Sequence, residues 1–127
     1  MVAALALLAS LNSYQISQDM AARYPDPYGV AAAEQRFAGA LEILPGATRL
    51  GYISDLPFSD NAGVSAFLAA QYAVAPRALL PLEGSGAEWV VGNFGRAADF
   101  AALGARSGLR LVRDFGNGVV VYRRSKP

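Results

Sequence analysis

The stretch TRLGYISDLPFSDNAGVSAFLAAQYAVAPRALLPL, residues 48–82, decides the fold because its pattern changes from strand to helix and back. Residues 48–53 predict a short strand, and a loop follows. Residues 61–72 place apolar side chains at helical spacing, and Pro76 ends that helix because proline cannot continue one. Residues 77–82 predict a second strand. The stretch is therefore expected to form a strand–helix–strand unit.

Downstream of this unit the same alternation continues. The pattern predicts a strand over residues 88–91, a helix over 96–105, a strand over 109–115 and a returning strand over 119–123. Gly116-Asn117-Gly118 predicts a tight hairpin turn. The link between the second and third strands is too short for a crossover helix, so this pair is either antiparallel or joined by an unusually short return.

Upstream, two helices are expected, over residues 2–23 and 30–44. The segment Tyr24-Pro25-Asp26-Pro27-Tyr28-Gly29 separates them, because its prolines stop a helix and its glycine completes a turn. We therefore divide the chain into an apolar helix with a Pro-rich turn, residues 1–29, and an α/β domain, residues 30–127. The expected fold is a small Rossmann-like α/β domain with a mixed, mostly parallel sheet, flanking helices, a C-terminal β-hairpin and an N-terminal helical arm.

The start of the chain is unusually apolar. Residues 2–11 read VAALALLASL, which is too short to span a bilayer. Three interpretations stay open: the outer end of a transmembrane helix whose remainder precedes Met1, an apolar helix that packs on this domain or on a second copy, and a signal peptide without a basic start.

The composition excludes several kinds of chemistry. The chain has no histidine and no cysteine, so Ser-His-Asp and Cys-His catalysis and the common zinc sites are absent. Eleven basic and ten acidic residues give a net charge of +1, which provides no global attraction to nucleic acid. We predict no cofactor, no metal and no nucleic-acid partner. Catalysis is disfavoured, although carboxylates alone can hydrolyse glycosides.

The candidate ligand-binding residues follow the strand ends. In open α/β sheets, ligands bind beyond the carboxyl ends of parallel strands. Asp55, Asp60, Asn93 and Arg96 are the polar residues predicted there, and together they would hold a nucleotide or a sugar. The alternative is structural, in which Asp60 caps a helix and Asp55 shapes a turn. Gly92-Asn93-Phe94-Gly95 leads from a strand toward a helix, as a phosphate-binding loop does, but lacks the G-x-G-x-x-G spacing.

Residues 44–124 show a family resemblance. It rests on four stretches, which read LPGATRLGYISDLP, FLAAQYAVAPRALLPL, EWVVGNF and LGARSGLRLVRDFGNGVVVYRR. They resemble the soluble C-terminal α/β segment of bacterial multi-span membrane glycosyltransferases of the lipid-linked-sugar type and of related uncharacterised membrane proteins. In such proteins the catalytic carboxylates lie in the membrane portion, so the resemblance transfers no active-site residue to this chain.

These observations lead to three functional expectations. The first is a non-catalytic accessory or interaction domain of a membrane-anchored bacterial protein, placed outside the cytoplasm in the periplasm and partnered by the membrane-embedded portion of that protein; a cytoplasmic location stays open. The second is a small-ligand-binding domain for a nucleotide or sugar. The third is a stand-alone structural protein that forms a homo-oligomer through residues 2–23.

Overall fold

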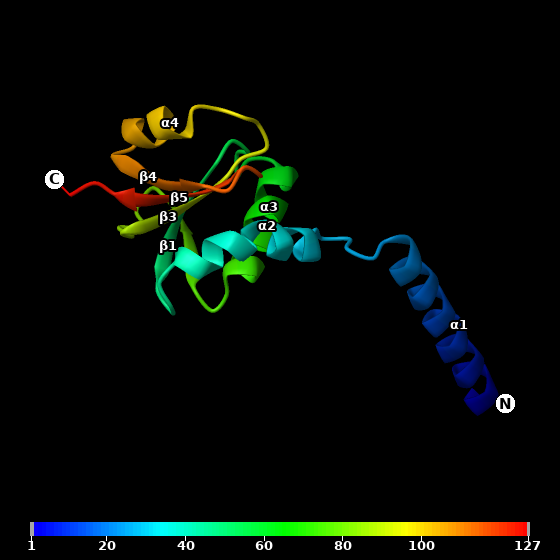
Figure 1. Ribbon diagram of the computed structural model, residues 1–127. Helices are drawn as coiled ribbons and strands as arrows, with labels where there is room; N and C mark the ends of the chain where they lie inside the picture. The colour runs from blue at the N-terminus through cyan, green and yellow to red at the C-terminus, as the bar shows by residue number, and fades with distance from the viewer. Residues whose placement is uncertain (1, 127) are drawn as a thin grey trace.

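The computed structural model describes residues 2–126 as an α/β domain with one helix projecting from it (Figure 1). In chain order the elements are α1 (Val2–Arg23), α2 (Val30–Ile43), β1 (Arg49–Ser54), α3 (Asn61–Val74), β2 (Ala78–Pro81), β3 (Trp89–Asn93), α4 (Phe100–Arg106), β4 (Leu109–Asp114) and β5 (Val119–Arg124). The predicted α/β class, both N-terminal helices and the C-terminal hairpin are confirmed.

The five strands form one open mixed sheet in the order β2-β1-β3-β5-β4. β1 is parallel to both of its neighbours, β2 and β3, whereas β5 is antiparallel to both β3 and β4. Two of the four pairings are therefore antiparallel, and the predicted Rossmann-like, mostly parallel sheet is not confirmed. The difference arises because β5 of the hairpin, rather than β4, enters the sheet beside β3.

The link from β2 to β3 is the short return that the sequence left as one of two alternatives. Both strands are parallel to β1 and flank it, so residues 82–88 must pass over β1 without a helix. Gly51 of β1 makes room for this passage. A Cβ atom at Gly51 would lie 3.2 Å from Ser85 Oγ and 2.9 Å from Val90 Cγ2. The glycine therefore lets an extended segment cover this part of the sheet, where a crossover helix is usual.

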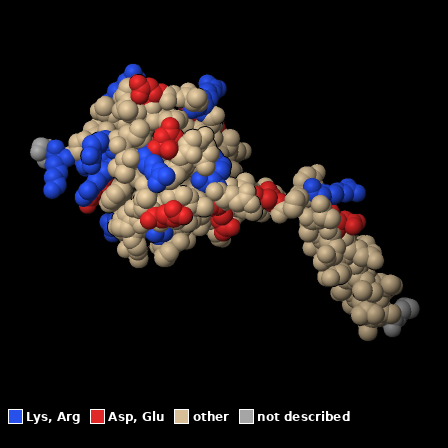
Figure 2. Space-filling model, viewed as in Figure 1, with Lys and Arg blue, Asp and Glu red and all other residues tan. Residues whose placement is uncertain are grey.

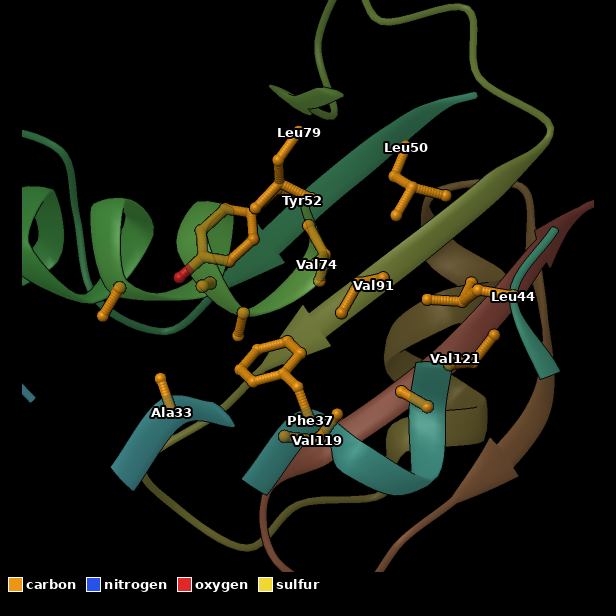
Figure 3. Packing of buried hydrophobic residues seen from close by; sticks show 14 residues of the cluster. Ala33, Phe37, Leu44, Leu50, Tyr52, Val74, Leu79, Val91, Val119 and Val121 are labelled. Carbon is orange, nitrogen blue, oxygen red and sulfur yellow. The ribbon is translucent and has the colours of Figure 1, made fainter. Parts of the chain in front are cut away.

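One face of the sheet packs against α2 and α3. Figure 3 shows the Phe37 ring directed from α2 toward Val91 of β3 and Val119 of β5. Phe37 and both valines are fully buried. Leu50 and Tyr52 of β1 continue this layer beneath α3. Strand residues two apart share a face, so these alternating positions hold the helices to the sheet.

The opposite face packs against α4. Tyr122 of β5 lies fully buried here, and its hydroxyl donates a 2.9 Å hydrogen bond to the carbonyl oxygen of Phe100. Gly104 allows α4 to approach closely, because a Cβ atom there would lie 2.5 Å from the Tyr122 ring. Burial, together with the charge of Asp114, raises the pKa of Tyr122 to about 12. The tyrosine therefore stays neutral and keeps its bond to α4.

The helix predicted over residues 96–105 begins later than expected, at Phe100. The Asp99 carboxylate accepts a hydrogen bond of 3.0 Å from the Ala102 N–H and so caps the helix at this point. Helix-forming residues precede Asp99, but a satisfied N-cap determines the first turn. Residues 94–98 consequently form a loop that runs over the end of the sheet.

The projecting helix α1 has no buried residue and joins the domain through residues 24–29 (Figure 1). The interpretation in which it packs on its own domain is therefore wrong. Asp26 fixes the link to α2, because its two carboxylate oxygens accept hydrogen bonds from the N–H groups of Ala31 and Ala32. These N–H groups at the start of α2, foremost that of Ala32, hold the pKa of the Asp26 carboxyl below its ordinary value of 3.8.

We expect Asp26 to titrate below 3.8 in the folded chain, because protonation removes the acceptor for two helix N–H groups. With the folded pKa depressed, the stabilisation is complete above the unfolded pKa and is lost as the pH falls through the folded value. A carboxyl ¹³C NMR titration measures this, and the urea-unfolded chain serves as the control. A folded midpoint at or above the unfolded one contradicts the prediction.

Candidate functional site

The ends of β1 and β3 bring two of the predicted site residues to the same edge of the sheet. The two strands are parallel neighbours, and their register aligns Ser54 with Asn93. Asp55 follows β1 directly, so it lies beside the segment that follows Asn93. The pairing of β1 with β3 therefore places Asp55 and Asn93 at adjacent strand ends, an adjacency that the sequence alone did not predict.

The Asp55 carboxylate binds the backbone of the loop after β3. One oxygen accepts a hydrogen bond of 2.9 Å from the Gly95 N–H, and the other accepts one of 3.1 Å from the Arg96 N–H. Asp55 therefore ties the end of β1 to residues 95–96. This role is structural, as one of the two alternatives proposed, but it crosses to another loop instead of shaping the local turn.

Asn93 points to the other side of the same edge, toward α2 and α3. Its side chain is only 6% exposed, and its Nδ2 donates a 3.1 Å hydrogen bond to the Tyr52 hydroxyl. The Tyr52 ring packs edge-on against Phe67 of α3, with 5.1 Å between ring centroids. A buried amide held by a buried tyrosine is a fixed polar group, because both side chains lack room to turn.

Asp60 and Arg96 lie in other surroundings. Asp60 occupies the N-cap position of α3 but makes no side-chain capping hydrogen bond. Arg96 lines a hollow of about 340 Å³ between the 94–98 loop and the hairpin, where Asp114 and Asn117 are also found. The four predicted residues therefore do not line one common hollow: Asp55 binds the Arg96 backbone, whereas Asn93 and Arg96 line different hollows.

The glycine-containing loop after β3 does not open a helix. Residues 94–98 separate β3 from α4, which has seven residues and begins at Phe100. The N–H groups of Gly95 and Arg96, which would face a phosphate in a binding loop, are bonded to Asp55. This segment therefore does not form the strand–loop–helix arrangement of a phosphate-binding site, whose G-x-G-x-x-G spacing it also lacks, since an acidic side chain already holds those N–H groups.

A hollow between α2 and α3 was not predicted from the sequence. It measures about 170 Å³, and Asn93, Arg36, Ser65 and Tyr28 are among its lining residues. An adjoining hollow of about 430 Å³ shares Tyr28 and Ser65 and is otherwise lined by apolar side chains. Side chains two residues apart in a strand point to the same face of the sheet, so the sequence of β3 could have placed Asn93 on the face of Val91. No sequence spacing relates Arg36 to Ser65, because only the packing of the two helices brings them together.

The basic C-terminal end of the chain forms a second polar surface. A hollow of about 720 Å³ lies beside the ends of β4 and β5, and Glu88, Arg110 and Arg124 are among its lining residues. Arg123 donates a 2.8 Å hydrogen bond from Nε to the Glu88 carboxylate, and its guanidinium lies 5.3 Å from the Trp89 ring centroid. These exposed contacts stabilise the sheet edge modestly.

Comparison with family models, curated proteins and solved structures found no match to this chain. Among residues 2–126, no three or more acidic side chains lie together as a metal-binding group would. None of the helices in that range combines the length and the apolar character needed to cross a membrane.

Asp55 and Asp60 allow a matched test of their roles. Asp55→Ala removes an acceptor from two loop N–H groups, so we expect a loss of about 1–2 kcal/mol in the free energy of unfolding. Asp60→Ala is the control, because Asp60 makes no side-chain capping bond, and it should change stability by less than about 0.5 kcal/mol. Urea unfolding measures both. Equal effects would contradict the assignment of Asp55 as the link between the loops.

Proposed function

We propose that this protein is a membrane-anchored, non-catalytic accessory domain. In this proposal α1 inserts its apolar N-terminal half into a bilayer, and the α/β domain of residues 30–127 stands on the membrane surface. The observation that supports it most directly is the exposure of α1. This helix has 22 residues, and none of them is buried against the domain.

The exposed side chains of α1 favour a lipid environment. Leu5, Leu7 and Leu8 are each more than 60% exposed, although leucine side chains are normally buried. The first charged residue of the chain is Asp19, and Figure 2 shows that the end of α1 farther from the domain displays neither acidic nor basic side chains. Such a helix lowers its free energy when lipid replaces water around it.

The apolar segment of α1 is long enough to cross part of the hydrocarbon core. Residues 2–11 rise about 15 Å as a helix, roughly half the thickness of the hydrocarbon core. Tyr14 then follows at the depth where tyrosines are enriched, near the lipid headgroups. Asp19 and Arg23 come after it, in the part of the helix that would stand in water.

Support for a non-catalytic role comes from the same chain. It has no histidine or cysteine to act as a base or nucleophile. The carboxylate best placed at the strand ends, that of Asp55, is bonded to two backbone N–H groups. The resemblance of residues 44–124 to the soluble segment of membrane glycosyltransferases supports a location outside the cytoplasm, beside a membrane-embedded partner.

Vesicle binding tests the anchor. We expect the full chain to bind phosphatidylcholine vesicles and Leu5→Glu/Leu8→Glu to weaken binding at least about a hundredfold, because each acidic side chain opposes insertion into hydrocarbon. Gln15→Glu/Gln18→Glu is the matched control, with the same added charge on the same helix outside the apolar segment. Flotation with the vesicles measures the bound fraction.

Two results would reject the anchor. The first is a chain that stays unbound at all lipid concentrations. The second is a chain that forms a homo-oligomer in the absence of lipid and loses it in Leu5→Glu/Leu8→Glu, which would establish residues 2–23 as a subunit interface.

A second candidate function, the binding of a small sugar or nucleotide, is favoured by the buried amide of Asn93. It lines the hollow between α2 and α3, where Arg36 and Ser65 offer further polar groups. Fixed polar groups beside an apolar wall are typical of small-molecule sites.

An NMR titration of the full chain tests this candidate with methyl glycosides and uridine and adenosine monophosphates. We expect saturable shifts at residues lining the hollow, and an affinity about tenfold lower in Asn93→Ala than in Asp60→Ala, whose side chain lies outside it. Circular dichroism confirms that both variants fold. The absence of saturable shifts for the whole panel would reject this candidate.

A further inference from the structure

The outer side of α3 is an apolar surface without charge. No acidic or basic residue occurs between Asn61 and Val74, although the helix lies at the surface of the domain. Its inner side is buried mainly through small residues, and Val64, Leu68 and Tyr72 lie on the outer side at spacings of four. Leu68 is 54% exposed and Tyr72 is 70% exposed. An exposed apolar helix face of this kind normally marks a site that binds a membrane or another protein.

This surface continues to the end of α1. A hollow of about 430 Å³ is lined by Leu68 and Tyr72 of α3 together with Tyr28 of the linker. A further hollow of about 500 Å³ is lined by Tyr28 together with Met20 and Tyr24 at the end of α1. Tyr28 belongs to both hollows and is itself 81% exposed. The exposed apolar side chains at the end of α1, in the linker and on α3 thus meet at Tyr28.

The linker keeps α3 close to the point where α1 leaves the domain. Its six residues, 24–29, span at most about 20 Å when extended. They are further shortened by the hydrogen bonds that Asp26 accepts from Ala31 and Ala32. The start of α2, and with it Tyr28 and the face of α3, therefore lies within one linker length of the end of α1.

We infer that the outer face of α3, with Tyr28, is a second membrane-contact surface that lies on the same bilayer as α1. This inference rests on the proposed function and adds the orientation of the domain. Val64, Leu68 and the Tyr72 ring enter the hydrocarbon at its boundary with the headgroups, while the ring of Tyr28 lies at headgroup level.

The chemistry of the surface favours lipid over a second copy of the chain. Tyrosine rings with polar hydroxyls surround aliphatic side chains, which matches the graded polarity of a bilayer surface. Between Asn61 and Val74 the surface offers no charged side chain that could form an ion pair with another protein. Its continuity with α1 also means that insertion of α1 brings it to lipid without a separate encounter.

Site-specific labelling tests the contact, because a chain without cysteine accepts a label at one chosen position. Leu8→Cys in α1, Tyr72→Cys in α3 and Val112→Cys in β4 each receive an environment-sensitive nitrobenzoxadiazole group. Val112 is the control, since it is exposed on β4, at the edge of the sheet farthest from β2. Phosphatidylcholine vesicles with brominated acyl chains quench a label that enters the hydrocarbon. We expect quenching at positions 8 and 72 and none at 112.

Each pattern of quenching has a definite meaning. Quenching at 8 alone leaves the anchor intact and overturns the α3 contact. Quenching at 72 alone rejects the anchor and retains the α3 contact. Quenching at none of the positions rejects both. A fluorescence change at 72 that depends on protein concentration and occurs without lipid would identify a second copy as the occupant and overturn the inference.

Affinity gives an independent measure that needs no label. Leu68→Ser/Tyr72→Ser should weaken binding of the full chain to phosphatidylcholine vesicles about tenfold, because two apolar side chains no longer leave water. Val112→Ser should leave the affinity unchanged. Both substituted α3 positions are exposed, so the fold is expected to persist, which circular dichroism verifies. Equal affinity of the α3 variant and the unaltered chain would overturn the inference.

Discussion

The burial of the central strands on both faces is the constraint on which this structure depends. Val119, Val120 and Val121 are consecutive residues of β5, so their side chains alternate between the two faces, yet all three are fully buried. Val90 and Val91 of β3 show the same burial. Each such side chain stabilises the fold by about 1.5–3 kcal/mol only while its face stays covered. The helices α2 and α3 are therefore needed on one face, and α4 with the 82–88 segment on the other.

Because both faces of the sheet are covered, the polar residues at the strand ends form hydrogen bonds within the protein. Asn93 follows the alternation of β3 onto the face of α2 and α3, where it must bond to Tyr52 because an unbonded buried amide is costly. Asp55 lies beyond the end of β1, where the uncapped N–H groups of Gly95 and Arg96 attract its carboxylate. The edge that would hold a ligand in many α/β proteins is here largely used to close the fold, and Asn93 lines the hollow between α2 and α3.

The sequence predicted those helices and turns that begin or end because of residues close to them in the chain. The apolar run of residues 2–11, the prolines of the 24–29 turn and the Gly116-Asn117-Gly118 hairpin were all assigned from neighbours in sequence. The late start of α4 was missed because helix-forming residues before Asp99 compete with its cap, and the cap prevails. The passage of residues 82–88 over Gly51 depends on space created by a missing side chain in another strand. The hollow of Arg36 and Ser65 depends on helix packing, for which a single sequence contains no spacing rule.

The stable domain leaves its apolar surface on one side, and this asymmetry orients the proposed membrane contact. The face of α3 presents few large apolar side chains, and α1 would hold it near the lipid and raise its effective concentration there. In this orientation β2 and β1, beneath α3, lie nearer the membrane than β4, at the opposite edge of the sheet. The arginines beside β4 and β5 then point away from the lipid, which leaves that basic edge accessible to the aqueous phase. In the proposed orientation the apolar face of α3 contacts the bilayer, and the basic edge beside β4 and β5 faces the water, where a partner could bind it.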